Sequence, residues 1–168
     1  MSSQTTTPGR IQDVPPEWNR VTEGIISAAI EVHSLLGPGL LERLYEEAMV
    51  YELRRRGLAL ERQRPVVLKY KDVDLGEQIL DLVVGGLVVV ELKSVDKVHD
   101  VHLRQLVSQM KSARLPLGLL INFNTTLLKD GLHRRVLSRH SPLPATFLSE
   151  PLPAPSRSSN PSAPSAIA

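Results

Sequence analysis

The sequence predicts an α/β fold in which a mixed β-sheet is flanked by helices, and three observations support this prediction. Residues 78–84 and 88–93 are apolar at nearly every position on either side of Gly85-Gly86, so both strands of this hairpin are expected to be buried on both faces. Three stretches have apolar residues at helical spacing. After residue 88, the order strand, helix, strand is that of a right-handed crossover between parallel strands.

Local signals place the other elements in order along the chain. Apolar spacing predicts a helix from residue 17 that ends at Gly37-Pro38-Gly39, and a second helix over 40–56. The buried stripe expected for the second helix is Leu41, Leu44, Tyr45, Ala48 and Met49. The remaining predicted elements are a strand at 64–70 with Pro65 at its start, a turn at 71–76, a helix over 101–113 with Asp100 as its N-cap, a buried strand at 117–123 and a weaker helix over 127–139.

Composition limits the class of protein. The 168 residues have room for one domain, which we place at 17–140, and the Pro- and Ser-containing residues 1–16 and 141–168 are expected to be disordered tails. The chain has no cysteine, which excludes disulfides and thiolate metal sites, and no apolar run of about 20 residues that would suit a membrane span. We therefore expect a cytoplasmic protein. The net charge of +2 is weak evidence for a nucleic-acid partner, so a binding surface has to come from local clustering.

Three ionisable residues interrupt the apolar hairpin: Asp81, Glu91 and Lys93. An unpaired buried charge is strongly unfavourable, so these side chains must pair with one another, bind a metal, or reach solvent in a cleft. Residues two apart on a strand share a face, which puts Glu91 and Lys93 on one side of the sheet. From this motif alone, a structural salt-bridge cluster and a functional site are equally supported.

The hairpin loop decides whether Asp81 joins the other two. A two-residue loop would send Asp81 to the face opposite Glu91, whereas a three-residue loop over 85–87 pairs Val84 with Val88 and sets Asp81 across from Glu91. We predict the three-residue loop or an equivalent bulge. The two carboxylates would then lie about 5 Å apart at Cβ, and Mg²⁺ is commonly held by one or two carboxylates with water and phosphate oxygens. A neighbouring lysine can orient or deprotonate a water, or stabilise charge on phosphate.

Two motifs carry a resemblance to known proteins. Asp81, followed by Glu91-x-Lys93 on the next strand, resembles the signature of the PD-(D/E)XK nuclease superfamily, whose fold is restriction-endonuclease-like. Gly39-x-x-Glu42-x-x-Tyr45 resembles the motif that names the GxxExxY protein family within that superfamily. The similarity extends over about residues 18–129. The segments that carry it include 30–33, 36–42, 51–53, 56–58, 65–66, 90–93 and 119–124.

The resemblance implies a metal-dependent nuclease. In this interpretation Asp81 and Glu91, with the Leu92 carbonyl, hold Mg²⁺ or Mn²⁺. Lys93 assists the attacking water, and Glu42 reaches the metal site from its helix. The resemblance also implies a nucleic-acid partner, with DNA favoured over RNA, and no association with a membrane. A homodimer is a candidate state, because many superfamily enzymes cut two strands as dimers.

Two other residues are candidates for the site, and two departures from the family favour an alternative function. Gln105 matches a glutamine that the family keeps on the phosphate-facing helix. His33 could line the cleft, although a lone helical histidine is more often structural. Gln109 stands where related nucleases have tyrosine, and residues 78–80 lack the basic residue that similar members carry upstream of Asp81. The alternative is a nuclease fold without turnover that acts as a nucleic-acid-binding or assembly module; a salt-bridge cluster with no nucleic-acid role is the least favoured interpretation.

Overall fold

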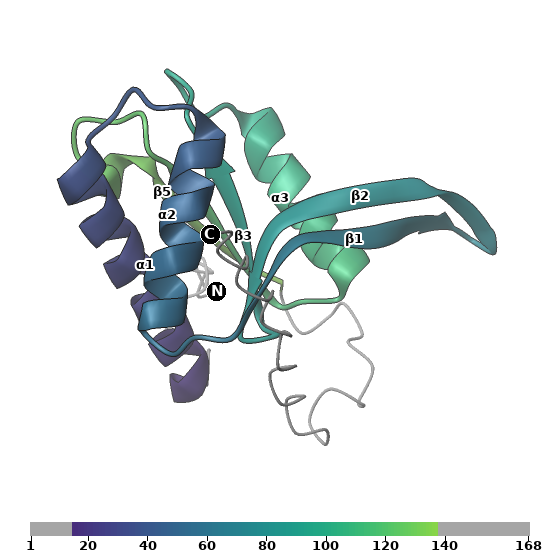
Figure 1. Ribbon diagram of the computed structural model, residues 1–168. Helices are drawn as coiled ribbons and strands as arrows, with labels where there is room; N and C mark the ends of the chain where they lie inside the picture. Colours follow the sequence, from purple (N-terminus) through teal and green to yellow (C-terminus); the bar gives the residue numbers. More distant parts are fainter. Residues whose placement is uncertain (1–14, 138–168) are drawn as a thin grey trace, which may run out of the picture.

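The computed structural model describes residues 15–137, in which one five-stranded sheet is packed against three α-helices (Figure 1). The elements in chain order are α1 (Pro16–Leu36), α2 (Glu42–Arg55), β1 (Leu60–Tyr70), β2 (Val73–Val84), β3 (Val88–Lys93), α3 (Asp100–Ala113), β4 (Leu117–Asn122), the 3-10 helix η2 (Leu128–Gly131) and β5 (Leu132–Val136). The strands follow the order β1-β2-β3-β4-β5. Only β3 and β4 run parallel. The predicted mixed α/β sheet is therefore confirmed.

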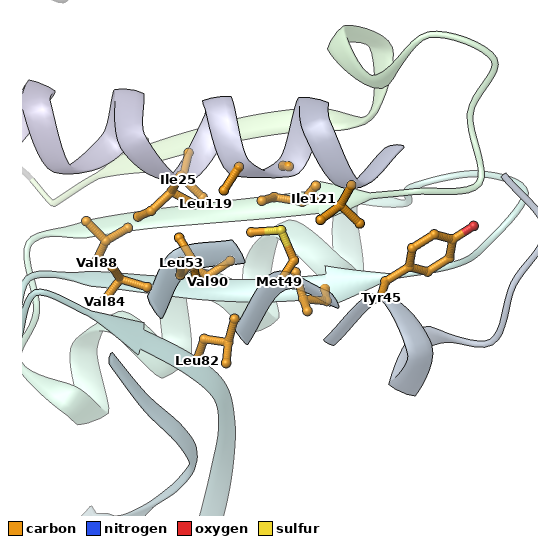
Figure 2. Packing of buried hydrophobic residues seen from close by; sticks show 14 of the residues in the cluster. Ile25, Tyr45, Met49, Leu53, Leu82, Val84, Val88, Val90, Leu119 and Ile121 are labelled. Atoms are coloured by element: carbon orange, nitrogen blue, oxygen red, sulfur yellow. The ribbon is translucent and has the colours of Figure 1, made fainter. Parts of the chain in front are cut away.

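The sheet separates two layers of helices. On one face, α1 and α2 cover a large apolar cluster that includes Leu82, Val84, Val88 and Val90 (Figure 2). On the other face, α3 covers a smaller cluster around Val89. Neighbouring residues of β3 thus belong to opposite clusters, as the alternation of side chains along a strand requires. The inner hairpin is buried on both faces, as predicted. No helix within residues 15–137 has the length and apolar character needed to cross a membrane.

The strands β1 and β2 extend well beyond the other three strands of the sheet. Only residues 82–84 of β2 pair with β3, while β2 pairs with β1 along nearly its whole length. The outer part leaves the body as a two-stranded arm (Figure 1). Its large exposed apolar side chains are Val67, Leu68, Tyr70, Val73, Leu75 and Ile79. A central hairpin that is buried throughout was expected from residue 78, so this expectation is wrong for Ile79.

The predicted first strand was too short, and the predicted turn after it was too long. β1 already begins at Leu60, so Pro65 lies within an edge strand and not at its start. The turn contains only Lys71 and Asp72, because Lys71 takes a left-handed backbone with φ 56° and β2 begins at Val73. Gly76 marks a bulge in the arm, where the register shifts, and not the end of a turn.

The predicted helix over 127–139 is wrong within the described residues. The segment forms η2 and then β5, which pairs antiparallel with β4. Its short apolar pattern is compatible with either structure, and the free edge of β4 supplies the hydrogen bonds that select the strand. Gly131 allows the approach, because a Cβ at this position would collide with the backbone oxygen of Asn122.

Two smaller predictions are also corrected. The N-cap of α3 is His99, whose N–H donates to Nδ1 of His102 at 3.1 Å, and Asp100 is the first helical residue. Leu41 and Leu44 are exposed because α2 begins at Glu42 and turns its other face to the sheet. The tail predicted at 141–168 lies outside the described residues. The tail predicted at 1–16 does so too, apart from Pro15 and Pro16, and Pro16 begins α1.

Candidate functional site

The hairpin between β2 and β3 has the three-residue loop that the sequence predicted. Val84 pairs with Val88, Val83 with Val89, and residues 85–87 form the turn. Continuing the same register sets Asp81 across from Glu91. The two carboxylates therefore occupy neighbouring strands on the α3 side of the sheet.

Asp81 lies at a bend in β2 and uses its side chain where a regular strand uses its backbone. The last residue of β2 that is paired with β3 is Leu82. One residue earlier, the Leu92 N–H donates to Oδ2 of Asp81 at 2.8 Å. Leu80 and Leu82 belong to opposite apolar clusters, although residues two apart on a regular strand share a face. The strand therefore rotates about its own axis at Asp81. This rotation, which we call the roll of β2, turns the carboxylate toward β3.

Glu91 is buried and is held on both sides. Lys93 Nζ donates to Oε1 of Glu91 at 2.5 Å, and Nε2 of Gln109 donates to Oε2 at 2.7 Å. Gln109 comes from α3 and is itself buried. Its Oε1 has no hydrogen-bond partner among the described residues. A carboxylate has about four lone-pair sites, so both oxygens of Glu91 keep capacity for a further ligand.

The electrostatics of the site favour a bound cation. Burial, followed by the charge of Glu91, raises the pKa of Asp81 from 3.8 to about 7. The Leu92 N–H and Lys93 oppose this shift, and Glu42 adds to it. Burial alone lowers the pKa of Lys93, but the hydrogen bond and charge of Glu91, with those of the other carboxylates, leave it raised above the usual value. One ammonium group thus incompletely compensates several carboxylates.

Glu42 approaches the site from the first turn of α2, where its charge raises the pKa of both Asp81 and Lys93. Tyr45 fixes the turn that precedes this helix. Its hydroxyl donates to the Gly37 carbonyl at 2.6 Å and accepts from the Leu40 N–H at 3.1 Å. The Ser94 hydroxyl then donates to the Leu40 carbonyl at 2.6 Å. The beginning of α2 is therefore tied to the residue that follows Lys93.

The ends of β3 and β4 are joined by a second set of contacts. The Phe123 N–H donates to the Lys93 carbonyl at 2.8 Å. The buried Asn122 amide accepts from the Val95 N–H at 3.0 Å and donates to the Val95 carbonyl at 2.8 Å. Phe123 also stacks on Tyr45, with ring centroids 4.4 Å apart and planes 8° from parallel. This packing links the α2 side of the site to the strand ends.

The two other candidate residues, His33 and Gln105, do not contact the carboxylates through hydrogen bonds within residues 15–137. Nε2 of His33 is 2.8 Å from the Thr125 carbonyl, so the histidine ties α1 to the loop after β4. Gln105 is exposed on α3, one turn before Gln109 and on the same side of the helix. Neither residue forms a hydrogen bond to Asp81, Glu91 or Lys93 within the described residues.

The donor set fits a hard divalent cation. Residues 15–137 contain no group of three or more His, Asp or Glu side chains arranged around one point. Asp81 and Glu91 supply two carboxylates, and Mg²⁺ commonly takes one or two carboxylates and completes its shell with water and phosphate oxygens. The pKa of Asp81 is raised mainly by burial and next by the charge of Glu91, and a bound cation would oppose both effects.

Sequence reasoning missed two residues of this neighbourhood. Gln109 was treated as a departure from the family pattern, and its contact with Glu91 crosses 18 positions of the chain. Glu46 was not singled out, although it lies one turn after Glu42 and is buried at only 8% exposure. A helical pattern with a charged residue on its apolar side is the signal that could have identified Glu46.

Comparisons with known proteins identify the family. A search of curated proteins and a search of solved structures each find no match. The family described as the PD-(D/E)XK nuclease superfamily matches residues 19–136, which is well over half of the chain and includes every strand of the sheet. The family inferred from Asp81 and the Glu91-x-Lys93 motif is confirmed at this level: the chain belongs to the PD-(D/E)XK nuclease superfamily.

Proposed function

We propose that this protein is a metal-dependent nuclease that hydrolyses phosphodiester bonds. The observation that carries the proposal is the meeting of Asp81, Glu91 and Lys93 at the bend of β2 and the end of β3, in a chain of a nuclease superfamily. An apolar hairpin has no structural need for two carboxylates and an ammonium group at the end of its strands.

The residues have distinct roles in this proposal. Asp81, Glu91 and the Leu92 carbonyl hold Mg²⁺ or Mn²⁺, and Glu42 supports the site from α2. When bound, the cation supplies positive charge for phosphate oxygens and lowers the pKa of a water. Lys93 orients the attacking water and stabilises the charge that develops on phosphate. Gln109 keeps the Glu91 carboxylate in place.

The charge distribution supports a nucleic-acid substrate on the α3 side of the sheet. Residues 97–137 contain seven lysines and arginines against two aspartates, whereas residues 15–96 contain ten basic and 14 acidic residues. The small net charge of the whole chain hides this asymmetry. Arg104 and Lys111 lie on α3 and Arg135 faces it, whereas Arg134 contacts Asn19 of α1. The basic residues beside α3 attract a polyanion, and the carboxylates of the site lie on the same side of the sheet.

A hollow between α3 and β5 is a second contact for the phosphate backbone in this proposal. Arg104, Lys111 and Arg135 line it together with Asp100. None of the three cations forms an ion pair within the described residues. The hollow lies on the side of α3 away from Gln109, so it extends the contact beyond the site of cleavage.

We favour DNA over RNA, a cytoplasmic location, a domain over 17–140 and a homodimer as parts of the same proposal.

A second candidate function is a binding or assembly module that keeps the fold without turnover. The observations that favour it are the absence of a basic residue in positions 78–80, just upstream of Asp81, and the occupation of both Glu91 oxygens by Lys93 and Gln109. Metal binding separates the two functions, because only the nuclease needs the cation.

The experiment that tests the proposal is cleavage of single- and double-stranded DNA and RNA with Mg²⁺, Mn²⁺ or a chelator. Wild type is compared with Asp81→Ala, Lys93→Ala and the control Lys69→Ala, which removes an exposed lysine of the arm. We expect metal-dependent cleavage that falls by about 10²-fold or more in both site variants and is unchanged in the control. Cleavage that persists in both site variants would refute the assigned site. Absence of cleavage together with absence of metal binding in calorimetry would leave the binding module.

A further inference from the structure

The β-ladder around Asp81 is interrupted on both sides. The register of β1 against β2 pairs Arg62 with Leu82 and Arg64 with Leu80, but the residues between them, Gln63 and Asp81, are not paired. The same register continues beyond them, so nothing has been inserted. On the other side, Asp81 bonds β3 through its carboxylate. Asp81 is thus released from both neighbouring strands at the point where β2 rolls over.

Gln63 has the unusual backbone that accompanies this interruption. Its φ is 49°, in the left-handed region that residues other than glycine seldom adopt. A non-glycine residue in this region is strained and persists only when its surroundings hold it there. The residue opposite Asp81 therefore needs a partner that fixes it.

Glu46 of α2 is that partner. Its Oε2 accepts from Nε2 of Gln63 at 2.8 Å, and its Oε1 accepts from Nε of Arg62. Arg62 is also held by Glu47, whose Oε1 accepts from Nη2 at 2.7 Å. Glu46 is buried, and Glu47 is exposed. One buried carboxylate thus accepts hydrogen bonds from two consecutive residues of β1, and the second of them, Gln63, lies across from Asp81.

We propose that Glu46 and Gln63 form a positioning unit for Asp81. Glu46 holds Gln63 in the left-handed conformation, this conformation keeps Gln63 out of the ladder, and the gap lets β2 roll so that Asp81 reaches the Leu92 N–H. Neither residue touches the substrate or the metal. The inference rests on the proposed function only for its consequence, which is a metal ligand set in place by a contact on the opposite side of β2.

The test uses a rescue that a purely stabilising role would not produce. Glycine adopts φ near 49° without strain, so Gln63→Gly keeps the gap without Glu46, whereas the β-branched side chain of Gln63→Val disfavours it. We compare Glu46→Ala, Gln63→Val, Gln63→Gly and the double variant Glu46→Ala/Gln63→Gly. Glu52→Ala is the matched control, because Glu52 is an equally buried glutamate of α2 whose partners are Arg55 and Arg56.

The first readout needs no metal. Amide hydrogen exchange at Leu92, measured by NMR on the folded protein, reports the bond to Asp81. We expect Glu46→Ala and Gln63→Val to raise the exchange rate at least about tenfold, the factor that loss of a hydrogen bond to a charged group gives. Exchange at Val90, in the same strand, should stay near the wild-type rate in every variant. Exchange at Leu92 should stay near the wild-type rate in Gln63→Gly, in the double variant and in Glu52→Ala. Equal effects of Glu46→Ala and Glu52→Ala, or no rescue by glycine, would overturn the proposal.

The second readout is Mn²⁺ affinity by calorimetry. We expect Glu46→Ala to weaken binding by about 10-fold or more, as loss of an outer partner of a ligand does, and glycine at position 63 to restore it. If wild type binds no Mn²⁺ but the exchange pattern is as expected, the metal-dependent function fails while the positioning unit stands. If wild type binds Mn²⁺ and Glu46→Ala does not change the Leu92 exchange rate, the positioning unit is refuted while the metal-dependent function stands.

Discussion

The two halves of β2 belong to one strand but have opposite environments. From Leu80 to Val84 the strand is buried, except at Asp81, because helices cover both faces, β1 pairs with it, and β3 pairs with residues 82–84. From Val73 to Ile79 it is exposed, except at Gln78, and only β1 accompanies it in the arm. Both halves contain valine and leucine. Asp81 lies at the boundary between them.

This contrast shows that a third strand and a helical cover decide burial, not the apolar character of the strand itself. A two-stranded ribbon alone is at best marginally stable in water, so the arm depends on the inner half for its order. The site lies where the rigid inner half meets solvent. A carboxylate there is buried enough to have a perturbed pKa and open enough to meet a ligand.

The largest expected effect separates two leucines of β2. Leu82 is fully buried and Leu75 in the arm is 59% exposed. We expect Leu82→Ala to lower the free energy of unfolding by about 2–5 kcal/mol and Leu75→Ala to change it by about 0.5 kcal/mol or less. Urea denaturation measures both. Similar losses for the two variants would mean that the arm is packed against a partner in solution.

The next prediction concerns the boundary residue and pH. The folded state raises the pKa of Asp81 from 3.8 to about 7, so it binds the proton more tightly than the unfolded chain. The resulting stability is fully present below pH 3.8 and is lost as the pH rises through about 7. In the presence of a chelator, Asp81→Asn should therefore melt at a higher temperature than wild type at pH 8, with the difference shrinking toward pH 4. A lower melting temperature at pH 8 would show that ionised Asp81 is well compensated without metal.

A bound cation should reverse that penalty at the boundary and leave the arm unchanged. At Mg²⁺ concentrations about ten times the dissociation constant, the free energy of unfolding should rise by about 1.4 kcal/mol. Thermal unfolding of wild type with and without Mg²⁺ measures this shift, and Asp81→Ala should not show it. A shift of equal size in Asp81→Ala would place the cation elsewhere on the protein.

The smallest predicted effect compares the cations of the arm with those of the α3 hollow. Lys69 pairs with Asp74 and Lys71 lies over the Tyr70 ring, whereas Arg104 and Lys111 have no ion pair within the described residues. Arg104→Ala and Lys111→Ala should each reduce the salt dependence of duplex DNA binding by about 0.9 in the log–log slope. Lys69→Ala should not change this slope. Fluorescence anisotropy without divalent metal measures it, and equal slopes for all variants would remove the hollow from the binding surface.

The sequence by itself determined the inner hairpin and its chemistry. Apolar runs on either side of Gly85-Gly86, interrupted by Asp81, Glu91 and Lys93, predicted the buried strands, the three-residue loop and the meeting of the two carboxylates. These features depend on alternation and on the length of one loop, which are properties of neighbouring residues. The superfamily followed from these charged residues together with the Gly39-x-x-Glu42-x-x-Tyr45 motif and the wider similarity over residues 18–129.

The tertiary structure alone decided the supports of the site. Glu46 meets Gln63, Gln109 meets Glu91, and β5 forms on the free edge of β4. Each of these contacts joins residues that are distant in the chain or selects between two local structures that the pattern allowed equally. No local period encodes such contacts, because they exist only after the strands and helices have packed. The length of the arm has the same origin, since β3 ends its pairing where Asp81 leaves the ladder.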